Sequence, residues 1–256
     1  MEQRIANGFG FITGAWPLDP GKATLVFIHG AGGSGAFWSA QVQGLTGRVN
    51  TVAVDLPGHG HSAGDGKLKI TDYAQAVVDF ISQIAVPKPI PCGLSMGGAI
   101  TQQLLIDHRD QIEAGILVST GARLKVAPVI FETIEKDYSA FVEMIGKLAV
   151  SAKTGPGPAQ AFKHELAGCN PEVTNGDFQA CDRFDGLERL TVIEAPVLVV
   201  SAQDDKLTPP KYADVLETDI KNASRSHIMD AGHIVPMEKP LEFNQAILEF
   251  LDRNEL

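Results

Sequence analysis

The chain has 256 residues, of which 44% are hydrophobic, and this is enough to bury one substantial core. Its 31 acidic and 21 basic residues give a formal net charge of −10, which disfavours nucleic acid and anionic membrane surfaces as partners. No apolar stretch approaches the roughly 18 residues that span a bilayer, and no secretory leader pattern is present. We therefore expect a soluble cytoplasmic protein without stable membrane insertion, acting on a small-molecule substrate.

Short apolar runs bounded by turn residues recur along the chain, as buried strands of a parallel sheet do. These runs cover residues 24–28, 49–54, 90–94, 114–119, 197–201 and, more weakly, 226–229. Apolar residues at helical spacing occupy 73–85, 99–107 and 241–251. The alternation predicts an α/β fold, in which helices flank both faces of a mostly parallel sheet and ligands bind beyond the carboxyl ends of the strands.

The alternation stops between residues 122 and 190, where helical patterns occur without a convincing strand. Glycines and prolines at residues 155–158 break this segment, and shorter helices are expected after them. We therefore predict a core of residues 1–121 and 191–256, with a helical cap insertion at 122–190 over the strand ends. Before the break, apolar residues at spacings of four, seven, four and three predict one amphipathic helix: Ile130, Ile134, Phe141, Ile145 and Leu148.

The strongest local motif is a G-x-S-x-G at residues 93–97, centred on Ser95, between a predicted strand and a predicted helix. Flanking glycines permit a sharp turn that holds the serine hydroxyl clear of the sheet. The helix that follows leaves free backbone N–H groups beside the serine. Pro91 has no N–H to donate within a sheet, so we expect this strand to begin late, near Cys92.

A serine hydroxyl is a weak nucleophile at neutral pH, so it needs a base and an acid that orients the base. Asp205 follows the predicted strand 197–201, with Asp204 beside it, and His233 follows the last predicted strand. Each would lie in a loop at the same edge of the sheet as Ser95. The order serine, acid, histidine is therefore compatible with a catalytic triad.

Together these motifs resemble the α/β-hydrolase family, from Thr24 to Leu251. Family members carry a His-Gly turn, an Asp-x-x-Gly-x-Gly-x-Ser turn, the serine turn, an acid four residues before a proline, and a late Gly-His. The matches, in order, are His29-Gly30, then Asp55 with Gly58, Gly60 and Ser62, then 93–97, then Asp205 with Pro209, then Gly232-His233. The resemblance implies the fold and a Ser95–His233–Asp205 triad that requires no metal or organic cofactor. The family spacing selects Asp205 and leaves Asp204 as a solvated or loop-capping neighbour.

An oxyanion hole is expected from the N–H of Met96 and a second N–H in the turn after His29-Gly30. Ala31 is the first choice for the second donor and Gly32 is the alternative. His29 itself is expected to be a structural residue rather than a base. An apolar pocket beneath the insertion has several candidate lining residues, for most of which core packing is an equally good interpretation: Gly32, Phe37, Trp38, Met96, Phe141 and Met144.

We predict hydrolysis of a carboxylic ester with a modest apolar acyl or alcohol group. The residues 92–98 are also similar to the elbow of 3-oxoadipate enol-lactonases, which act on a dicarboxylate, and Arg123 is the candidate cationic residue for such a substrate. Carbon–carbon bond hydrolases, thioesterases and cofactor-free haloperoxidases use similar elbows and stay open. A non-catalytic ligand receptor is a further alternative.

Two other patterns suggest different chemistry. Residues 30–35 satisfy G-x-G-x-x-G, with Asp55 at the distance of a ribose-binding acid, but a dinucleotide site leaves the later serine, acid and histidine motifs unexplained. Asp55, His59 and His61 resemble the start of a metal site, and a metal-dependent hydrolase is the corresponding alternative. No further His or Cys cluster completes that set, and the three widely spaced cysteines predict neither a disulfide framework nor a zinc cluster.

Overall fold

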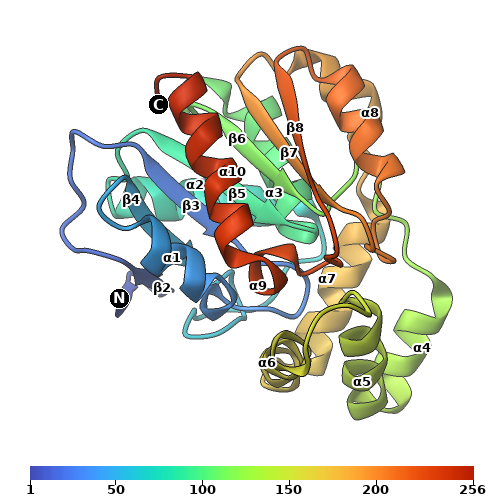
Figure 1. Cartoon of the computed structure of the whole chain (residues 1–256). Coiled ribbons are helices and arrows are strands. Elements are labelled where there is room, and N and C mark those ends of the chain that lie inside the picture. Colours follow the sequence, from blue (N-terminus) through green and yellow to red (C-terminus); the bar gives the residue numbers. More distant parts are fainter.

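The fold is built on one twisted sheet of eight strands, seen in a computed structural model that describes residues 1–256 (Figure 1). The strand order is β1-β2-β4-β3-β5-β6-β7-β8. The pairs β1–β2 and β2–β4 are antiparallel and every other pair is parallel, which confirms the expected fold class. The strands are β1 (Glu2–Ala6), β2 (Phe9–Thr13), β3 (Thr24–Ile28), β4 (Asn50–Val54), β5 (Pro89–Leu94), β6 (Gly115–Val118), β7 (Val197–Ala202) and β8 (Ala223–Ile228).

The hairpin of β1 and β2 was not predicted, although the sequence contains its signal. Asn7 and Gly8 form the two-residue connection, with φ values of 47° and 88°. Positive φ at both positions is what a type I′ hairpin turn requires, and Asn-Gly is the dipeptide that adopts it most readily. The β1 strand is too exposed and polar to show a buried apolar run, so a search for such runs passes over it.

The expectation that β5 begins near Cys92 is wrong, because the strand includes Pro91 and starts at Pro89. On one side β5 pairs with β3 along this whole stretch, and Pro91 stands opposite Val26. On the other side, pairing with β6 starts only at Cys92, opposite Ile116. The proline therefore lies where β5 has a single neighbour, so its missing N–H is tolerated there.

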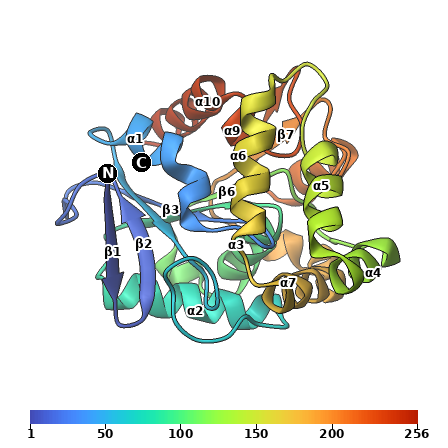
Figure 2. The ribbon, with the colours of Figure 1, turned by 90° about the horizontal axis from the view of Figure 1, so that it is seen from below.

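Helices cover both faces of the sheet and divide the core into two layers (Figures 1 and 2). Leu25 and Phe27 of β3 pack in the layer that contains apolar residues of α1 and α10. Val26 and Ile28, which point to the opposite face, pack in the layer that contains those of α2, α3 and α8. The helices are α1 (Ser39–Leu45), α2 (Ile70–Gln83), α3 (Met96–Asp107), α8 (Lys211–Asp219), α9 (Val235–Glu238) and α10 (Pro240–Arg253), with short 3₁₀ turns η1 (Gly35–Trp38), η2 (Arg109–Gln111) and η3 (Leu187–Val192).

Four further helices, here called the cap, lie between β6 and β7 in the sequence and gather at one end of the sheet (Figure 1). They are α4 (Pro128–Lys136), α5 (Tyr138–Leu148), α6 (Pro156–Ala167) and α7 (Pro171–Arg183). The prediction of one helix through residues 130–148 is wrong, because the chain breaks at Asp137. This residue is extended, with φ −157°, and its carboxylate caps α5 by accepting the N–H of Ala140 at 3.0 Å.

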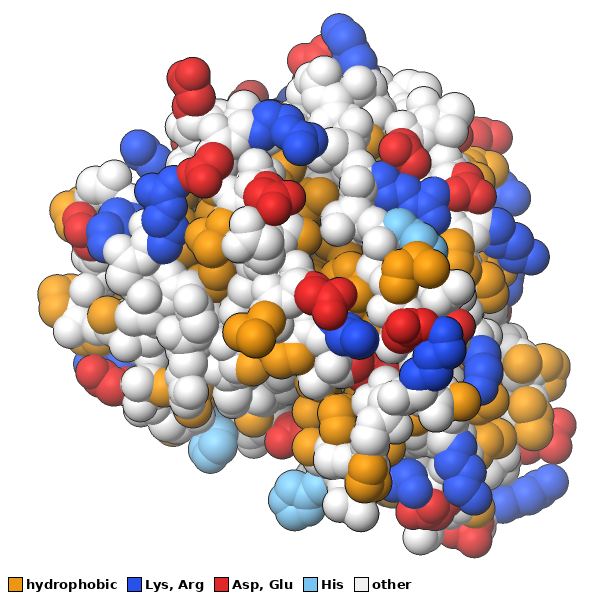
Figure 3. Space-filling model, viewed as in Figure 1, with side chains coloured by type: hydrophobic (Ala, Val, Ile, Leu, Met, Phe, Trp, Pro, Cys, Tyr) orange, Lys and Arg blue, Asp and Glu red, His pale blue; other side chains and the backbone are white.

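The surface carries acidic and basic side chains interspersed on the face shown in Figure 3. No helix combines the length and the apolar character needed to cross a bilayer. The net charge of −10 is thus distributed without a large single-sign patch on this face.

Candidate active site

Ser95 occupies a strained turn between β5 and α3. Its φ of 54° and ψ of −111° are unusual for a residue with a side chain, and such strain is common at functional sites. The glycines of the motif allow the chain to approach itself closely, since a Cβ at Gly93 would lie 2.0 Å from the carbonyl oxygen of Gly97. Met96 begins α3, so its N–H has no partner within the helix. The turn therefore presents a hydroxyl and a free N–H side by side.

Asp205 and His233 are in direct contact. His233 Nδ1 lies 3.1 and 3.0 Å from the two carboxylate oxygens of Asp205. The carboxylate also accepts the N–H groups of Leu207 and Thr208, both at 2.9 Å, and the Thr208 hydroxyl at 2.9 Å. Sequence reasoning missed Thr208, although it lies between Asp205 and Pro209 of the predicted acid motif. Its position three residues after the acid is a signal for a local side-chain cap.

These contacts fix the charge of Asp205 and the tautomer of His233. Burial raises the pKa of Asp205, but the charge of His233 and hydrogen bonds from His233 and Thr208 outweigh burial and hold the pKa below its ordinary value. Because an ionised carboxylate only accepts hydrogen bonds, the proton of a neutral His233 ring lies on Nδ1. The unprotonated Nε2 is then free to act as a base. Asp204 faces elsewhere and accepts the hydroxyl of Ser151 at 2.5 Å.

Ser95 and His233 line one cavity of about 320 Å³ between the core and the cap. No direct hydrogen bond joins the Ser95 hydroxyl to the imidazole. Catalytic hydrogen bonds are often long before substrate binds and shorten in the complex. The arrangement can therefore support proton transfer from a serine to a histidine once a substrate occupies the cavity.

The turn after β3 lies against Ser95, since a Cβ at Gly30 would lie 3.5 Å from Ser95 Cβ. Two of its N–H groups are occupied. Gly32 N–H donates to Asp177 Oδ2 at 2.8 Å and Gly33 N–H donates to the Gly30 carbonyl at 3.1 Å. Of the two donors expected in this turn, Ala31 and Gly32, only Ala31 lines the cavity and has an N–H without a protein partner.

Hydrophobic residues make up most of the cavity wall, and both the core and the cap contribute to it. Of the predicted pocket residues, Met144 and Phe37 line it, whereas Gly32, Trp38, Met96 and Phe141 do not. Trp38 is fully buried and stacks on Phe27 in the core, with ring centroids 4.9 Å apart. Phe141 stacks on Tyr138 within the cap, with ring centroids 5.5 Å apart. Both large rings are used for packing, which sequence spacing does not distinguish from pocket lining.

Arg123 lines the mouth of the cavity, but an acidic partner balances its charge. Its Nε lies 2.8 Å from Asp185 Oδ2 in an exposed ion pair. The hydrogen bond and the charge of Asp185 raise the pKa of Arg123. Lys125 and Lys206 also line the cavity. An anionic substrate group would thus compete with Asp185 for the arginine.

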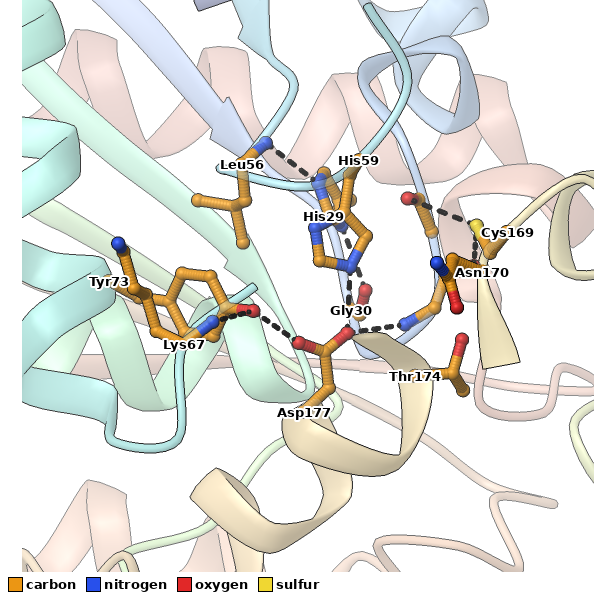
Figure 4. A network of polar contacts seen from close by, with 12 residues as sticks. His29, Gly30, Leu56, His59, Lys67, Tyr73, Cys169, Asn170, Thr174 and Asp177 are labelled. Atoms are coloured by element: carbon orange, nitrogen blue, oxygen red, sulfur yellow. Dashed lines mark hydrogen bonds and ion pairs between the residues drawn. The ribbon is translucent and has the colours of Figure 1, made fainter. Parts of the chain in front are cut away.

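His29 and His59, from the first two turns of the motif series, belong to a buried network next to the cavity (Figure 4). His29 Nδ1 donates to the Gly30 carbonyl at 2.9 Å and its Nε2 accepts the Leu56 N–H at 3.1 Å. Burial, followed by the charge of His59, lowers the pKa of His29 to about 3, so the ring is neutral. His29 is therefore placed as a structural residue that fixes the turn.

The residues considered for a metal site have other partners. His59 contacts the Pro57 carbonyl through Nδ1 at 3.1 Å and Asp177 Oδ2 through Nε2 at 2.8 Å. Asp55 accepts the N–H groups of Gly35 at 2.7 Å and His61 at 2.8 Å. No three His, Cys, Asp or Glu side chains are arranged to hold a metal ion. These contacts instead tie residues 55–61 into a hydrogen-bonded turn.

The buried pair of His59 and Asp177 predicts a specific dependence of stability on pH. Burial lowers the pKa of His59, but the charge of Asp177 and hydrogen bonds to Asp177 and Pro57 outweigh burial and raise it. Stability from the charged ring is therefore complete below the ordinary histidine pKa of about 6.5 and is lost as pH rises through the raised value. We expect the urea midpoint of the wild type to fall more between pH 6 and 9 than that of the double variant His59→Gln/Asp177→Asn. Parallel curves for the two proteins would contradict this linkage.

Comparison with known proteins places the chain in a family. Residues 25–246 match the profile of the alpha/beta hydrolase family. A relative from Caulobacter segnis that carries the provisional name carbamate hydrolase RutD is 25% identical, over 98% of this chain and 99% of its own. The structure of a thermophilic esterase is 28% identical with a TM-score of 0.84, covering 99% of this chain and 97% of that one. The enol-lactonase from Burkholderia xenovorans LB400 has the same fold, with a TM-score of 0.88 at 22% identity, covering 98% and 100% of the two chains.

Proposed function

The chain belongs to the alpha/beta hydrolase family, and from this premise we propose that it is a serine hydrolase that cleaves a carboxylic ester of a small, apolar substrate. The single observation that carries the proposal is the contact of His233 Nδ1 with the buried Asp205 carboxylate. The His233 ring lines the same cavity as Ser95. That contact leaves Nε2 unprotonated and directed away from the acid. A base in this state can activate a serine hydroxyl.

The reaction proceeds in two halves. In the first, Ser95 Oγ attacks the acyl carbon while His233 Nε2 accepts its proton, and the tetrahedral intermediate collapses as the alcohol leaves with that proton. In the second, His233 accepts a proton from water, the hydroxide attacks the acyl-enzyme, and Ser95 recovers its proton as the acid leaves. Asp205 stabilises the imidazolium that forms transiently in each half.

The negative oxygen of the tetrahedral intermediate needs two donors, for which we propose the N–H groups of Met96 and Ala31. Met96 directly follows the nucleophile at the start of α3. Ala31 is favoured over Gly32 because the Gly32 N–H already donates to Asp177. Fixed donors of this kind are among the largest contributors to acyl-transfer catalysis.

The cavity supports a small substrate with an apolar acyl or alcohol group. Its volume of about 320 Å³ lies at the lower end of the range for small-molecule sites. Arg123, the cation expected for a dicarboxylate lactone, is paired with Asp185, but Lys125 and Lys206 also line the cavity, so the lactone stays an alternative. We assign residues 1–121 and 191–256 to a catalytic core and 122–190 to a cap that closes the pocket. Three unpaired cysteines are compatible with a reducing, cytoplasmic location.

Fluorophosphonate labelling tests the proposal, because these probes phosphonylate activated serines. We expect one label per chain, located at Ser95 by peptide mass spectrometry, together with turnover of short p-nitrophenyl esters. Absence of labelling, or labelling at another residue, would contradict the mechanism. Tight ligand binding with negligible turnover across an ester panel would favour a receptor instead.

The size of the cavity predicts a preference for short acyl chains. Among p-nitrophenyl esters, kcat/KM should rise from acetate to about butyrate or hexanoate and then fall, as each buried methylene contributes about 0.8 kcal/mol until the cavity is full. Met144→Ala should move this optimum towards longer chains, because Met144 is a partly exposed wall residue on α5. Val142→Ala on the same helix is the control, since Val142 does not line this cavity. An unchanged optimum in Met144→Ala would show that acyl groups bind elsewhere.

A further inference from the structure

Asp177 is a fully buried carboxylate that the cap helix α7 inserts into the core. Its Oδ1 accepts the Tyr73 hydroxyl at 2.5 Å, and its Oδ2 lies 2.8 Å from both His59 Nε2 and Gly32 N. Figure 4 shows His59 and Tyr73 pointing towards this carboxylate. Asp177 was not among the residues predicted from the sequence, because no motif surrounds it.

The surrounding hydrogen bonds determine the charges in this network. A backbone carbonyl only accepts, so His59 Nδ1 donates its proton to Pro57 O. Burial lowers the pKa of His59, but the charge of Asp177 and the hydrogen bond to it raise this pKa above its ordinary value, which favours the charged ring with a second proton directed at Asp177. The pair is therefore a buried imidazolium and carboxylate. The opposite charge of His59 explains how the Asp177 carboxylate can be buried. It does not explain why the same carboxylate oxygen also accepts the N–H of Gly32.

The cap contacts Gly32 from several sides. The Cys169 thiol donates to the Gly32 carbonyl at 2.7 Å, while Asp177 accepts its N–H. A Cβ at Gly32 would lie 3.0 Å from Thr174 Cγ2 and 3.2 Å from Leu166 Cδ2. Gly32 also has a φ of 65°, which favours glycine. Both polar groups of this residue are thus held by cap side chains.

Gly32 is one residue away from Ala31, the second oxyanion donor of the proposed reaction. Rotation of the peptide that carries Gly32 N changes ψ of Ala31 and with it the path of the turn that faces Ser95. A displacement of about 1 Å in a catalytic donor can cost up to 10²-fold in rate. We propose that Asp177 is a positioning residue, which holds the turn at residues 30–33 so that the Ala31 N–H is directed at the intermediate formed on Ser95.

This inference rests on the proposed serine hydrolase function, and Asp177→Asn tests it. Without the carboxylate, His59 is neutral and its single ring proton stays on Nδ1, where it is donated to the Pro57 carbonyl. The unprotonated Nε2 then accepts a hydrogen bond, so the NH₂ group of the introduced amide turns to the position that Oδ2 of Asp177 occupies in the wild type. Gly32 N–H then faces a donor and loses its acceptor. We expect kcat for p-nitrophenyl butyrate to fall about 10- to 100-fold, with KM changing less than about threefold.

A transition-state analogue separates positioning from a merely structural role. An alkyl boronic acid forms a tetrahedral adduct on an active serine, with an oxygen in the oxyanion hole. Its affinity for Asp177→Asn should fall by about the same factor as kcat, whereas the pH midpoint of kcat/KM should stay at the wild-type value. Glu172→Gln is the matched control, because it changes an exposed carboxylate to an amide on the same helix. That control should keep wild-type kcat and boronate affinity.

The outcomes distinguish the two proposals. Folded Asp177→Asn with unchanged kcat and boronate affinity would overturn the positioning role, while loss of labelling in Ser95→Ala would still support the hydrolase. If Asp177→Asn does not fold, the double variant His59→Leu/Asp177→Leu carries the test, because it leaves no unpaired buried charge and still removes the acceptor of the Gly32 N–H. We expect at least about a tenfold loss of kcat and boronate affinity there, and no loss in either quantity would overturn the proposal.

Discussion

Replacement of Ser95 by alanine is expected to lower kcat for ester hydrolysis on the order of 10⁶-fold and to abolish fluorophosphonate labelling. The variant keeps the apolar cavity and the His233–Asp205 contact but has no atom that can form the acyl-enzyme. Removal of the serine or the histidine of a triad costs nearly as much as removal of all three residues, because they act as a unit. Burst and steady-state assays with p-nitrophenyl butyrate measure this loss.

A second serine gives the matched control for this prediction. Ser119 is also buried and has a positive φ of 45°, but its hydroxyl has no hydrogen-bond partner. Ser119→Ala removes an equivalent atom from the end of the neighbouring strand and should leave kcat within about threefold of the wild type, as a buried hydroxyl without a partner contributes little. Hydrolytic activity retained by Ser95→Ala would refute the proposed mechanism outright.

Asp205→Asn has the second largest expected effect, a loss in kcat of about 10⁴-fold with a small change in KM. The amide can donate a hydrogen bond to His233 Nδ1, which moves the ring proton to Nε2. The base then faces Ser95 with a proton instead of a lone pair. The effect on catalysis is large although the packing is nearly unchanged, because the carboxylate and the amide have almost the same shape.

The adjacent aspartate provides an internal comparison, since Asp204→Asn makes the same chemical change one residue earlier. Asp204 accepts the Ser151 hydroxyl, a role that the amide oxygen can keep. We expect kcat of Asp204→Asn to stay within about threefold of the wild type. Equal losses in the two variants, measured with one ester at one pH, would show that the acid had been assigned incorrectly.

The sequence predicted the parallel part of the sheet and the order of motifs because both depend on short-range patterns. Five apolar runs mark buried strands. The glycines around Ser95 mark a tight turn, because a Cβ at Gly93 would lie only 2.0 Å from the carbonyl oxygen of Gly97. The family match over residues 25–246 confirms the resemblance. The assignment of Ser95, His233 and Asp205 as a triad remains a prediction, which the contact between the last two supports.

Several features that sequence reasoning missed depend on contacts between distant segments. Asp177 and Gly32 are 145 residues apart, and no local pattern connects them. Trp38 and Phe141 have the composition of pocket residues, but the choice between cavity and core depends on which neighbours fill the space. The break at Asp137 was hidden by a helical period that continues across it. In that case the missed signal was local, since aspartate is a strong N-cap residue.

The cap helices differ in their contacts with the site, and this has a consequence for enzyme engineering. Helices α4 and α5 contribute apolar residues to the cavity wall, such as Ile130 and Met144, whereas α7 is hydrogen-bonded through Asp177 to the turn beside the nucleophile. Randomised libraries confined to α4 and α5 should therefore yield variants with new substrate preferences at high frequency. Libraries that include Asp177 should yield mostly inactive clones, whatever shape of pocket they create.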